Sequence, residues 1–404
     1  MKLEPNGFTA PHRRILEQAA RWSRESHQPV WLVGGPVRDS LLGRQPEDVD
    51  LAVERGAAGL ARALADRLGG RSIEHPDFLT AAALLDDGDI VDVVTTRRET
   101  YAAPGALPSV RAGTIRDDLL RRDFSVNAIA LELESGETVD PAGGRADLEA
   151  RLLRVLHARS FVDDPTRIFR ALRLATRLGF AIEPETETLL HASVEANALA
   201  TVSRERLWRE LRLTMREPDA AAALEALAAA KALDALLGPV RSDGREALLR
   251  RAETLRDEAG LDGELLLLDA LLGPDARCEK VLPGSGLSGQ RQSVLRSLRG
   301  AGELAERIAS TSGREARLAL LDHVPAETLG ALRFDERAAE AAASQVRYRE
   351  TALPFHGDEL GVPPGAHLGA ALRDTRRAIA LGEIAPDEAL AFARARALEY
   401  LRER

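Results

Sequence analysis

Residues 30–53 constrain the fold of this chain more than any other stretch. A short apolar run at 30–33 predicts a buried strand, and the chain then reaches Gly34-Gly35, where no side chain keeps a ligand away from the backbone. The helix expected to start there would present free N–H groups and a positive dipole end, which favours a phosphate, with Arg38 one turn further on. A Gly-Gly pair alone is also typical of an ordinary turn.

The chain returns as a second predicted strand at residues 48–53. The two-residue period of a strand puts Asp48 and Asp50 on one face, opposite the apolar positions. Neighbouring carboxylates repel each other unless a cation lies between them, and their hard oxygen atoms suit Mg²⁺. An Asp-x-Asp pair arises easily by chance among 64 acidic residues. A phosphate cradle followed by a carboxylate pair nevertheless predicts phosphoryl transfer.

A predicted hairpin at 80–85 and 90–95 carries a third acidic candidate. Asp92 interrupts an otherwise apolar strand, where a charge is costly unless it is paired or bound to a metal. We therefore expect Asp92 to act as a third carboxylate beside Asp48 and Asp50. The alternative is an edge-strand aspartate that faces water.

A loop and a polar cluster follow the hairpin. Residues 97–115 carry two prolines and two glycines with little periodicity, which predicts a mobile loop near the site. Arg122, Asp123 and Asn127 then stand at the entrance of another predicted strand. Such a set can bind a sugar and its phosphates, although an ion-paired loop cap explains the same residues.

Charged residues recur at regular spacing where the helical half of the chain begins. Pro165 suits the first position of a helix, which makes Asp164 the expected N-cap. Arg167, Arg170 and Arg173 then follow at steps of three, with Asp164 within reach of the first. One interpretation is a capped helix with a solvated basic face. The other is an acceptor beside a planar donor fork, which could pair with the Watson–Crick edge of a base.

Length and composition predict a soluble protein of several domains. The chain has 404 residues, of which 45% are apolar, so two to four domains are expected. No apolar run approaches the roughly 18–20 residues that span a membrane, and the first residues lack a hydrophobic signal region. The single cysteine, Cys278, excludes an intramolecular disulfide. We expect a cytoplasmic location.

Charge is distributed unevenly along the chain. The formal net charge is −9, which by itself argues against a nucleic-acid partner. Residues 151–177, however, hold seven arginines against two aspartates, a local balance of +5. Segregated charge of this kind keeps nucleic acid open as a partner.

Taken together, the motifs resemble those of the class II tRNA nucleotidyltransferase and bacterial poly(A) polymerase family. The resemblance extends from about residue 12 to the end, in the family's order. It rests on Gly34-Gly35-x-Val-Arg38-Asp39-x-Leu-Leu-Gly43 with Asp48-x-Asp50, Arg121-Arg122-Asp123-Phe-Ser-Val-Asn127-Ala, Asp163-Asp164-Pro-x-Arg167-x-x-Arg170-x-x-Arg173, Ser203-x-Glu205-Arg206-x-x-x-Glu210-Leu, and Gly357-Asp-Glu-Leu-Gly361 with Pro364-Gly365-x-x-Leu-Gly369.

The resemblance implies an α+β fold. A nucleotidyltransferase head with a mixed sheet of the polymerase-β-like type and its helices would be followed by an all-α neck, body and tail. We place the catalytic head at residues 1–145, the neck with its base-template helix at 146–215, the body at 216–345, and a tail that contacts tRNA at 346–404.

The resemblance also implies roles for the head residues. Asp48 and Asp50 would hold two Mg²⁺ ions that activate the RNA 3′-hydroxyl and neutralise the leaving pyrophosphate. Gly34, Gly35 and Arg38 would bind the triphosphate. Three residues would serve the ribose and phosphates: Arg122, Asp123 and Asn127. A protein template would select the incoming base through Asp164 and Arg167, supported by Arg170 and Arg173.

Two positions depart from the family pattern. Asp163 stands where glutamate is usual, which shortens a side chain beside the template pair. Leu79, in the segment 75–80, stands where many members have a glycine. No His-Asp phosphohydrolase motif is visible in the C-terminal half.

The expected activity is the addition of CCA, or part of it, to tRNA 3′ ends from CTP and ATP. A CC-adding or A-adding member of a split pair is the alternative within the family. Further alternatives are a poly(A) polymerase acting on RNA 3′ ends and an inactive RNA-binding module. The expected partner is the acceptor arm and elbow of tRNA, with no membrane; the sequence leaves the oligomeric state open.

Overall fold

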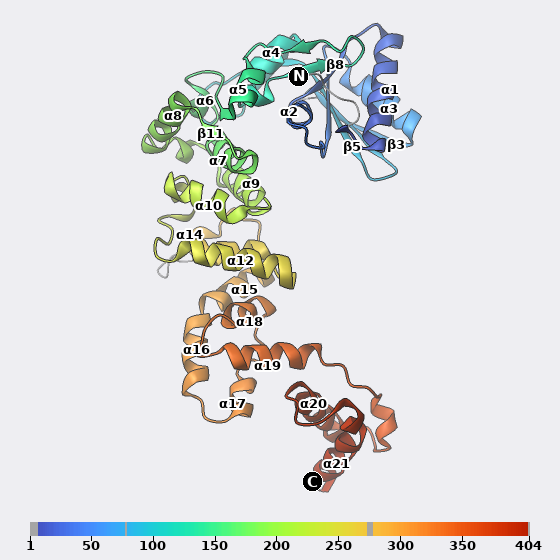
Figure 1. Cartoon of the computed structure of the whole chain (residues 1–404), viewed down its shortest axis with the longest axis vertical. Coiled ribbons are helices and arrows are strands. Elements are labelled where there is room, and N and C mark those ends of the chain that lie inside the picture. Colours follow the sequence, from blue (N-terminus) through green and yellow to red (C-terminus); the bar gives the residue numbers. More distant parts are fainter. Residues whose placement is uncertain (1–6, 77–78, 273–277, 403–404) are drawn as a thin grey trace. The chain divides into compact units, whose positions relative to one another are not determined.

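The computed structural model describes residues 7–76, 79–272 and 278–402. The chain divides into two compact units, residues 1–240 and 241–404. The first unit holds the β-strands together with the first half of the helices, and the second unit is helical (Figure 1). The α+β class is therefore confirmed.

Seven strands of the described part of the first unit form one mixed sheet (Figure 1). They are β1 (Val30–Val33), β2 (Val49–Val53), β3 (Gly70–His75), β4 (Thr80–Leu85), β5 (Ile90–Thr95), β8 (Ala130–Glu132) and β9 (Thr138–Val139). The order across the sheet is β3-β4-β5-β2-β1-β8-β9. β2 and β5 run parallel, whereas the other neighbours are antiparallel.

The central strands are buried because helices pack over the sheet. β1 is buried along its whole length and β2 at four of its five residues. α1 (Ala10–Ser26) and α3 (Ala57–Leu68) pack together beside the sheet, with α3 against β3, β4 and β5 (Figure 1). α4 (Ile115–Leu120) contributes to a core cluster with Trp31 of β1. This packing holds β2 in place, and with it the carboxylate pair.

The segment 97–115 corrects our expectation of a mobile loop. It contains β6 (Arg97–Thr100) and β7 (Ser109–Ala112), which pair antiparallel as a separate two-stranded sheet. The hydroxyl of Thr96 donates to the carbonyl of Gly113 at 2.6 Å, which closes the base of this ribbon. Neither strand has a buried apolar face, so the sequence shows no period of two that would reveal them.

Of the remaining helices of the first unit, α2 (Gly35–Leu41) lies between β1 and β2 and the others follow the sheet in the chain. These others are α5 (Gly144–Ala150), α6 (Ser160–Asp163), α7 (Thr166–Leu178), α8 (Pro184–Glu195), α9 (Arg204–Met215), α10 (Ala220–Ala229) and α11 (Asp234–Leu237), with 3₁₀ turns at Ser125–Asn127 and Ala198–Thr201. Two short parallel strands, β10 (Leu152–Leu153) and β11 (Ala181–Ile182), interrupt the region that we expected to be entirely helical.

α7 is the helix on which the base-template residues lie. Its apolar face is buried, with Ile168 and Phe169 fully inaccessible to solvent. Gly179, in the left-handed conformation with φ +69°, ends the helix. α9 and α10 pack against α7, so the position of its polar face is set by the core on the other side.

The second unit is built from helices. They are α12 (Arg245–Ala259), α13 (Gly263–Leu271), α14 (Cys278–Val281), α15 (Gly289–Arg299), α16 (Ala301–Ser310), α17 (Arg314–Ala319), α18 (Ala326–Leu332), α19 (Ala339–Glu350), α20 (Ala366–Ala380) and α21 (Ala389–Arg402), with 3₁₀ turns at Gly357–Leu360 and Pro386–Glu388. One core cluster surrounds Leu321 and another surrounds Leu360. Among the described helices of the whole chain, none has the length and hydrophobicity that crossing a membrane would require. The division into head, neck, body and tail stays a prediction.

Candidate active site

A cavity of about 550 Å³ in the first unit collects nearly all of the predicted site residues. Twelve of the thirteen line it: Gly34, Gly35, Arg38, Asp48, Asp50, Arg122, Asp123, Asn127, Asp164, Arg167, Arg170 and Arg173. Asp92 is the exception. These residues come from the β1–α2 turn and α2, the start of β2 and the residue before it, the segment after α4, and α7 with Asp164 two residues before it.

The β1–α2 turn has the backbone geometry that the glycine pair suggested. Gly34 has φ +76°, and a Cβ atom there would lie 2.6 Å from Nη1 of Arg122. Any other side chain would therefore displace an arginine of the cavity wall as well as strain the backbone. Pro36 occupies the first turn of α2.

Arg38 is held firmly by protein partners. It is buried, and it forms a two-pronged ion pair with Asp39, from Nε to Oδ1 and from Nη2 to Oδ2, both at 2.8 Å. Its Nη1 donates to the side-chain carbonyl of Asn127 at 2.6 Å. Asp39 escaped the sequence analysis as a site residue, although its place directly after the arginine was a signal.

The two carboxylates of the β2 region lie at the cavity wall, Asp48 immediately before the strand and Asp50 within it. Burial raises the pKa of Asp50 to about 6; Arg122 opposes this rise, while Asp92 and Asp48 add to it. Asp50 and Asp92 are register partners on the parallel strands β2 and β5. Asp92 is solvent-exposed, and both desolvation and the charge of Asp48 raise its pKa. Asp92 thus neighbours the pair without lining the cavity.

The carboxylate pair fits a Mg²⁺ site that is completed by substrate. No cluster of three or more acidic, histidine or cysteine side chains arranged for a metal occurs in the part of the chain that the structure describes. Mg²⁺ commonly takes one or two protein carboxylates, with waters and substrate phosphates filling its other positions. Burial is the main cause of the raised pKa of Asp50, and the charges of Asp92 and Asp48 add to it; a cation would relieve that repulsion.

Asp118 fixes two arginines of the cavity wall and was not predicted. Its fully buried carboxylate accepts from Arg121 at 2.7 and 3.0 Å through Oδ1, and from Arg122 at 3.0 Å through Oδ2. Burial alone would raise the pKa of Asp118, but the two guanidinium groups lower it below its ordinary value. The spacings of three and four residues were the available signal.

Asp123 connects the segment after α4 to α7. Its Oδ1 accepts from the amide of Asn127 at 3.0 Å, and its Oδ2 accepts from Nε of Arg170 at 3.0 Å. Burial by itself would raise the pKa of Asp123; the Arg170 charge and the Asn127 hydrogen bond overcome this and hold that pKa well below its usual range. Asp123 is therefore ion-paired, as the loop-cap interpretation expects, and it also lines the cavity, as the sugar-binding interpretation requires.

Asp164 caps the start of α7 with its side chain, as predicted. Its backbone is extended, and Pro165 after it has helical angles. Its Oδ1 accepts from the backbone N–H of Thr166 at 3.2 Å and from its hydroxyl at 2.7 Å. The same oxygen accepts from Nη2 of Arg206 at 2.9 Å. Oδ2 of Asp164 has no hydrogen-bond partner among the described residues.

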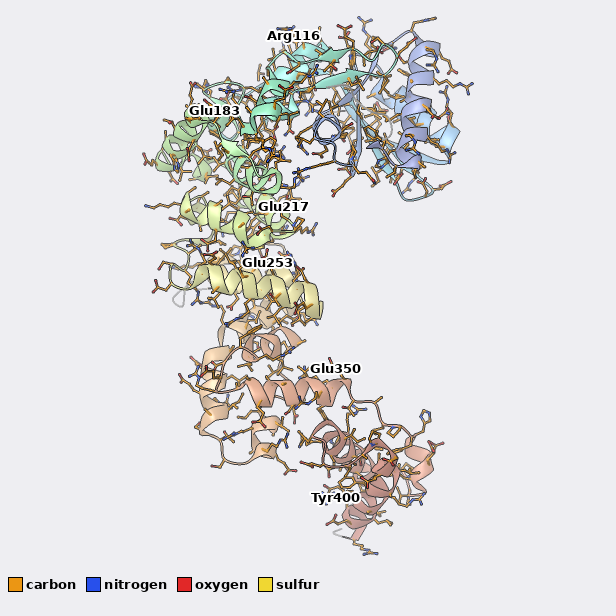
Figure 2. The ribbon with its side chains drawn as sticks, viewed as in Figure 1. Arg116, Glu183, Glu217, Glu253, Glu350 and Tyr400 are labelled. Carbon is orange, nitrogen blue, oxygen red and sulfur yellow. The ribbon has the colours of Figure 1, made fainter. Side chains whose placement is uncertain are left out.

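The arginines of α7 do not form a solvated face. Arg167 is buried, and its guanidinium donates to the hydroxyl of Ser160 at 2.7 Å and to the backbone carbonyl of Arg121 at 2.9 Å, not to Asp164. Arg173 pairs with two acidic groups, at 3.1 Å to Glu210 of α9 and at 3.3 Å to Glu217 just beyond it. Glu217 is labelled in Figure 2. Sequence analysis missed both acidic partners.

The segment at residues 97–112 adds three further residues to the cavity wall: Glu99, Tyr101 and Pro108. Glu99 accepts from Nη1 of Arg121 at 2.8 Å and from the hydroxyl of Tyr101 at 3.1 Å. Burial, reinforced by Glu99, raises the pKa of Tyr101 to about 12, so this phenol stays protonated at neutral pH. No sequence signal pointed to Glu99 or Tyr101.

Leu79 has the backbone conformation that a glycine would take without strain. Its φ is +55°, in the region that side-chain-bearing residues rarely occupy. Its carbonyl accepts from the backbone N–H of Thr95 at 2.8 Å. Asp77 and Phe78 of the same segment 75–80 lie outside the described residues.

Family models match two parts of the chain. Residues 30–154 match the Poly A polymerase head domain, and residues 179–242 match the probable RNA and SrmB- binding site of polymerase A. The first match contains the β-sheet and the carboxylate pair. Its end agrees within a few residues with the point at which the helices begin to predominate.

Similar proteins are named as nucleotidyltransferases acting on tRNA. An A-adding tRNA nucleotidyltransferase of Halalkalibacterium halodurans is 39% identical over 61% of this chain and 59% of its own length. In two other A-adding relatives the match spans only 24% and 23% of their length. A CC-adding tRNA nucleotidyltransferase of Deinococcus radiodurans is 38% identical over 84% of this chain and 82% of its own length.

Solved structures extend the similarity to the whole chain. An apo CCA-adding enzyme matches with a TM-score of 0.78 and 26% identity, over 98% of this chain and 96% of that one. Other matched structures are complexes with ATP, with CTP and with tRNA. With the motifs in family order and a relative matched over more than four fifths of both chains, this chain belongs to the tRNA nucleotidyltransferase and bacterial poly(A) polymerase family.

Proposed function

We propose that this protein adds nucleotides to the 3′ end of tRNA, using CTP and ATP. One observation carries the proposal: a single cavity holds the Asp48 and Asp50 pair together with Asp164 and Arg167. The first pair suits phosphoryl transfer, and the second presents an acceptor and a donor to a base. Family membership supports the same reaction, and its tRNA substrate would place the protein in the cytoplasm.

The carboxylate pair would hold Mg²⁺, two ions in our proposal. When bound, Mg²⁺ would increase the nucleophilicity of the RNA 3′-hydroxyl and neutralise charge on the leaving pyrophosphate. The turn at Gly34 and Gly35 leaves the backbone open to the triphosphate, and Arg38 lies beside it in the wall. Arg38 is fixed by Asp39 and Asn127, so it enters the reaction already oriented.

The ribose and phosphates would meet the polar set after α4. Arg122 lies against the turn glycine, and its guanidinium is held by Asp118 and by the carbonyl of Asn127. Asp123 and Asn127 are joined by their own hydrogen bond. Their remaining donors and acceptors face a cavity whose wall is already rigid, which reduces the entropy lost when a sugar is bound.

The template pair would read the amino edge of cytosine or adenine. Oδ2 of Asp164 lacks a described partner and can accept from the exocyclic amino group that both bases carry. Arg167 donates two described hydrogen bonds, to Ser160 and to Arg121, and a guanidinium has five N–H donors. The remaining donors suit the ring nitrogen beside the amino group. Guanine and uracil present a carbonyl to the carboxylate instead and would be rejected.

The proposal also concerns which nucleotides the protein adds. Addition of the full CCA sequence is our first choice, and a CC-adding or A-adding specialist is the alternative; A-adding and CC-adding relatives both match this chain. We further propose that the helices downstream of the head, residues 146–404, bind the acceptor arm and elbow of the tRNA, as neck, body and tail.

The proposal is tested by incorporation on three tRNA transcripts, which end at the discriminator base, at C and at CC. CTP and ATP are offered separately and together, with GTP and UTP as controls. A full CCA product, a stop after CC, or A added only to the CC end separates the three specificities. Absence of incorporation on all three transcripts, with a folded protein and Mg²⁺ present, would refute the proposed function.

A further inference from the structure

A seventh arginine of the cavity has no role in the reaction described so far. Arg177 lies in the last turn of α7, ten residues after Arg167, and lines the same cavity as Arg38. It continues the spacing of Arg167, Arg170 and Arg173, with a final step of four residues. Its place on the helix therefore puts it on the face that the template residues share.

Arg177 differs from the other cavity arginines in its partners. Arg38, Arg121, Arg122, Arg167, Arg170 and Arg173 each donate at least one hydrogen bond to a protein group. Among the described residues, Arg177 makes no hydrogen bond, and its nearest acidic contact is Glu217 at 3.9 Å. Arg173 approaches Glu217 more closely, at 3.3 Å. The Arg177 guanidinium is thus the least engaged in the wall.

The surroundings of Arg177 favour an anion. Burial lowers the pKa of Arg177 most, and the charges of Arg38 and Arg173 lower it further. The charges of Glu217 and Asp39 oppose this lowering. Two guanidinium groups that repel each other across a cavity are stabilised by an anion that both can contact. A phosphate suits this position, because its several oxygens can accept paired N–H donors from two guanidinium groups at once.

Resting on the proposed function, we propose that Arg177 binds a phosphate of the incoming nucleoside triphosphate, on the side of the cavity where Arg38 lies. Arg38 keeps two carboxylate contacts and one amide contact within the protein, so it supplies charge from a fixed position. Arg177, whose side chain is 38% exposed, supplies donors that can turn toward the ligand. The same chemistry could serve a backbone phosphate of the RNA 3′ end, and the experiment separates the two sources.

The test compares the wild type with Arg177→Ala, Arg177→Lys and the control Arg216→Ala. Arg216 is exposed at the end of α9 and does not line the cavity. The measurements are the KM for CTP at saturating tRNA, the KM for tRNA at saturating CTP, and the binding of CTP, pyrophosphate and cytidine without tRNA. Melting curves show whether each variant is folded.

We expect Arg177→Ala to weaken CTP and pyrophosphate by about ten- to a hundredfold, the range for a hydrogen bond to a charged group. Cytidine, which lacks phosphates, should bind as before, and the KM for tRNA should not change. Arg177→Lys should recover part of the affinity because it keeps the charge without the planar fork. Arg216→Ala should resemble the wild type.

Three outcomes would overturn the assignment. A rise in the KM for tRNA alone would place the phosphate in the RNA. A lower melting temperature with unchanged binding would mean that Arg177 only stabilises the fold, through Glu217 and the end of α7. Equal losses for cytidine and pyrophosphate would indicate a distorted cavity. If the wild type fails to extend tRNA, the proposed function falls, whereas pyrophosphate binding still decides the role of Arg177.

Discussion

The strand side and the helix side of the cavity differ in how their charges are balanced. Asp48 and Asp50, on the strand side, make no hydrogen bond or ion pair with any described residue. On the helix side, Arg167, Arg170 and Arg173 all have protein partners, and Arg170 and Arg173 are paired with carboxylates. One wall therefore carries carboxylates that no described arginine contacts directly, although the charge of Arg122 acts on Asp50, and the other carries side chains that are fixed in place.

This difference separates two tasks. A carboxylate pair without a direct cationic partner is suited to a cation that arrives with the substrate, and such a pair costs energy until the cation binds. A network of paired side chains resists movement, which suits recognition of a base by shape and hydrogen bonds. Substitutions on the strand side should therefore act on the rate of chemistry, whereas substitutions on the helix side should act on the choice of nucleotide.

The largest effect is expected for Asp50→Ala. Loss of the carboxylate that we propose to hold Mg²⁺ should lower incorporation by at least about a thousandfold, since metal ions contribute several kcal/mol to such transition states. Binding of tRNA should survive, because Asp50 belongs to the strand side. The measurements are the rate of nucleotide incorporation and the Kd for tRNA.

Asp66→Ala is the matched control for Asp50→Ala, because Asp66 is an exposed aspartate of α3 away from the cavity. It removes one negative charge and should leave the rate unchanged. Retained incorporation in Asp50→Ala would remove the metal assignment, and with it the division of tasks between the two walls.

A second effect, smaller by about an order of magnitude, is expected for Arg167→Ala. Loss of a charged donor to the base should reduce the preference for CTP and ATP over UTP and GTP by roughly ten- to a hundredfold. The affinity for tRNA should change less. The relative kcat/KM values of the four nucleotides on one transcript measure this.

Because Arg167 is buried and also holds Ser160 and Arg121, its removal should lower the melting temperature. Arg167→Lys therefore accompanies it, keeping the charge in a folded protein. Arg116→Ala is the control, since Arg116 is exposed on α4 (Figure 2). Unchanged discrimination in both Arg167 variants would contradict the template role.

Much of the cavity could be predicted because its residues stand in short local patterns. The Gly-Gly turn and the Asp-x-Asp strand depend on neighbours within a few positions, and twelve residues identified in this way do line one cavity. The helix start was predicted in the same way: Pro165 has helical angles, and Asp164 directly before it accepts from the backbone N–H of Thr166. Local rules therefore gave both the element and the residue that caps it.

The partners of those residues could not be predicted from local patterns. Arg170 and Asp123 are 47 residues apart, Arg173 and Glu217 44 apart, and Arg206 and Asp164 42 apart. Pairs at such separations depend on how the helices pack, and the sequence holds 55 basic and 64 acidic residues that could combine in many ways. The strands at 97–112 were missed for a different reason, since they have no buried face.

A third test varies the pH and acts on the strand side alone. Because burial raises the pKa of Asp50 to about 6, the carboxyl should become protonated and lose its metal as the pH falls through 6. Incorporation should then decrease about tenfold per pH unit below the midpoint. Higher Mg²⁺ should shift the midpoint to lower pH, because the ion competes with the proton.

The raised pKa of Asp50 also makes the stability of the fold depend on pH. Activity should fall as the pH falls, whereas this contribution to stability should fall as the pH rises. A carboxyl whose folded pKa lies above its unfolded value of 3.8 favours the folded state most when it is protonated, below about pH 4. That contribution is lost as the pH rises from about 4 through 6. In metal-free protein, Asp50→Asn should remove this pH dependence of the melting temperature. If the pH midpoint of activity does not change with the Mg²⁺ concentration, a group other than Asp50 titrates.

The smallest effect is expected for Arg206→Ala, which loosens the helix side without touching the base. Arg206 donates to Oδ1 of Asp164 and to the carbonyl of Gly105, both at 2.9 Å, so it ties the template carboxylate to the ribbon segment. Asp164 would keep its contacts with Thr166. We therefore expect discrimination between nucleotides to fall only about three- to tenfold, the range for one hydrogen bond.

The readout for Arg206→Ala is the same set of kcat/KM values, with Arg209→Ala as the control because Arg209 is exposed on the same helix. Arg206→Lys should restore part of the discrimination, since one of the two contacts can be kept. A uniform fall in rate for all four nucleotides would mean that Arg206 supports catalysis in general. In that case the helix side would not be specialised for base choice, and the contrast between the two walls would lose its main support.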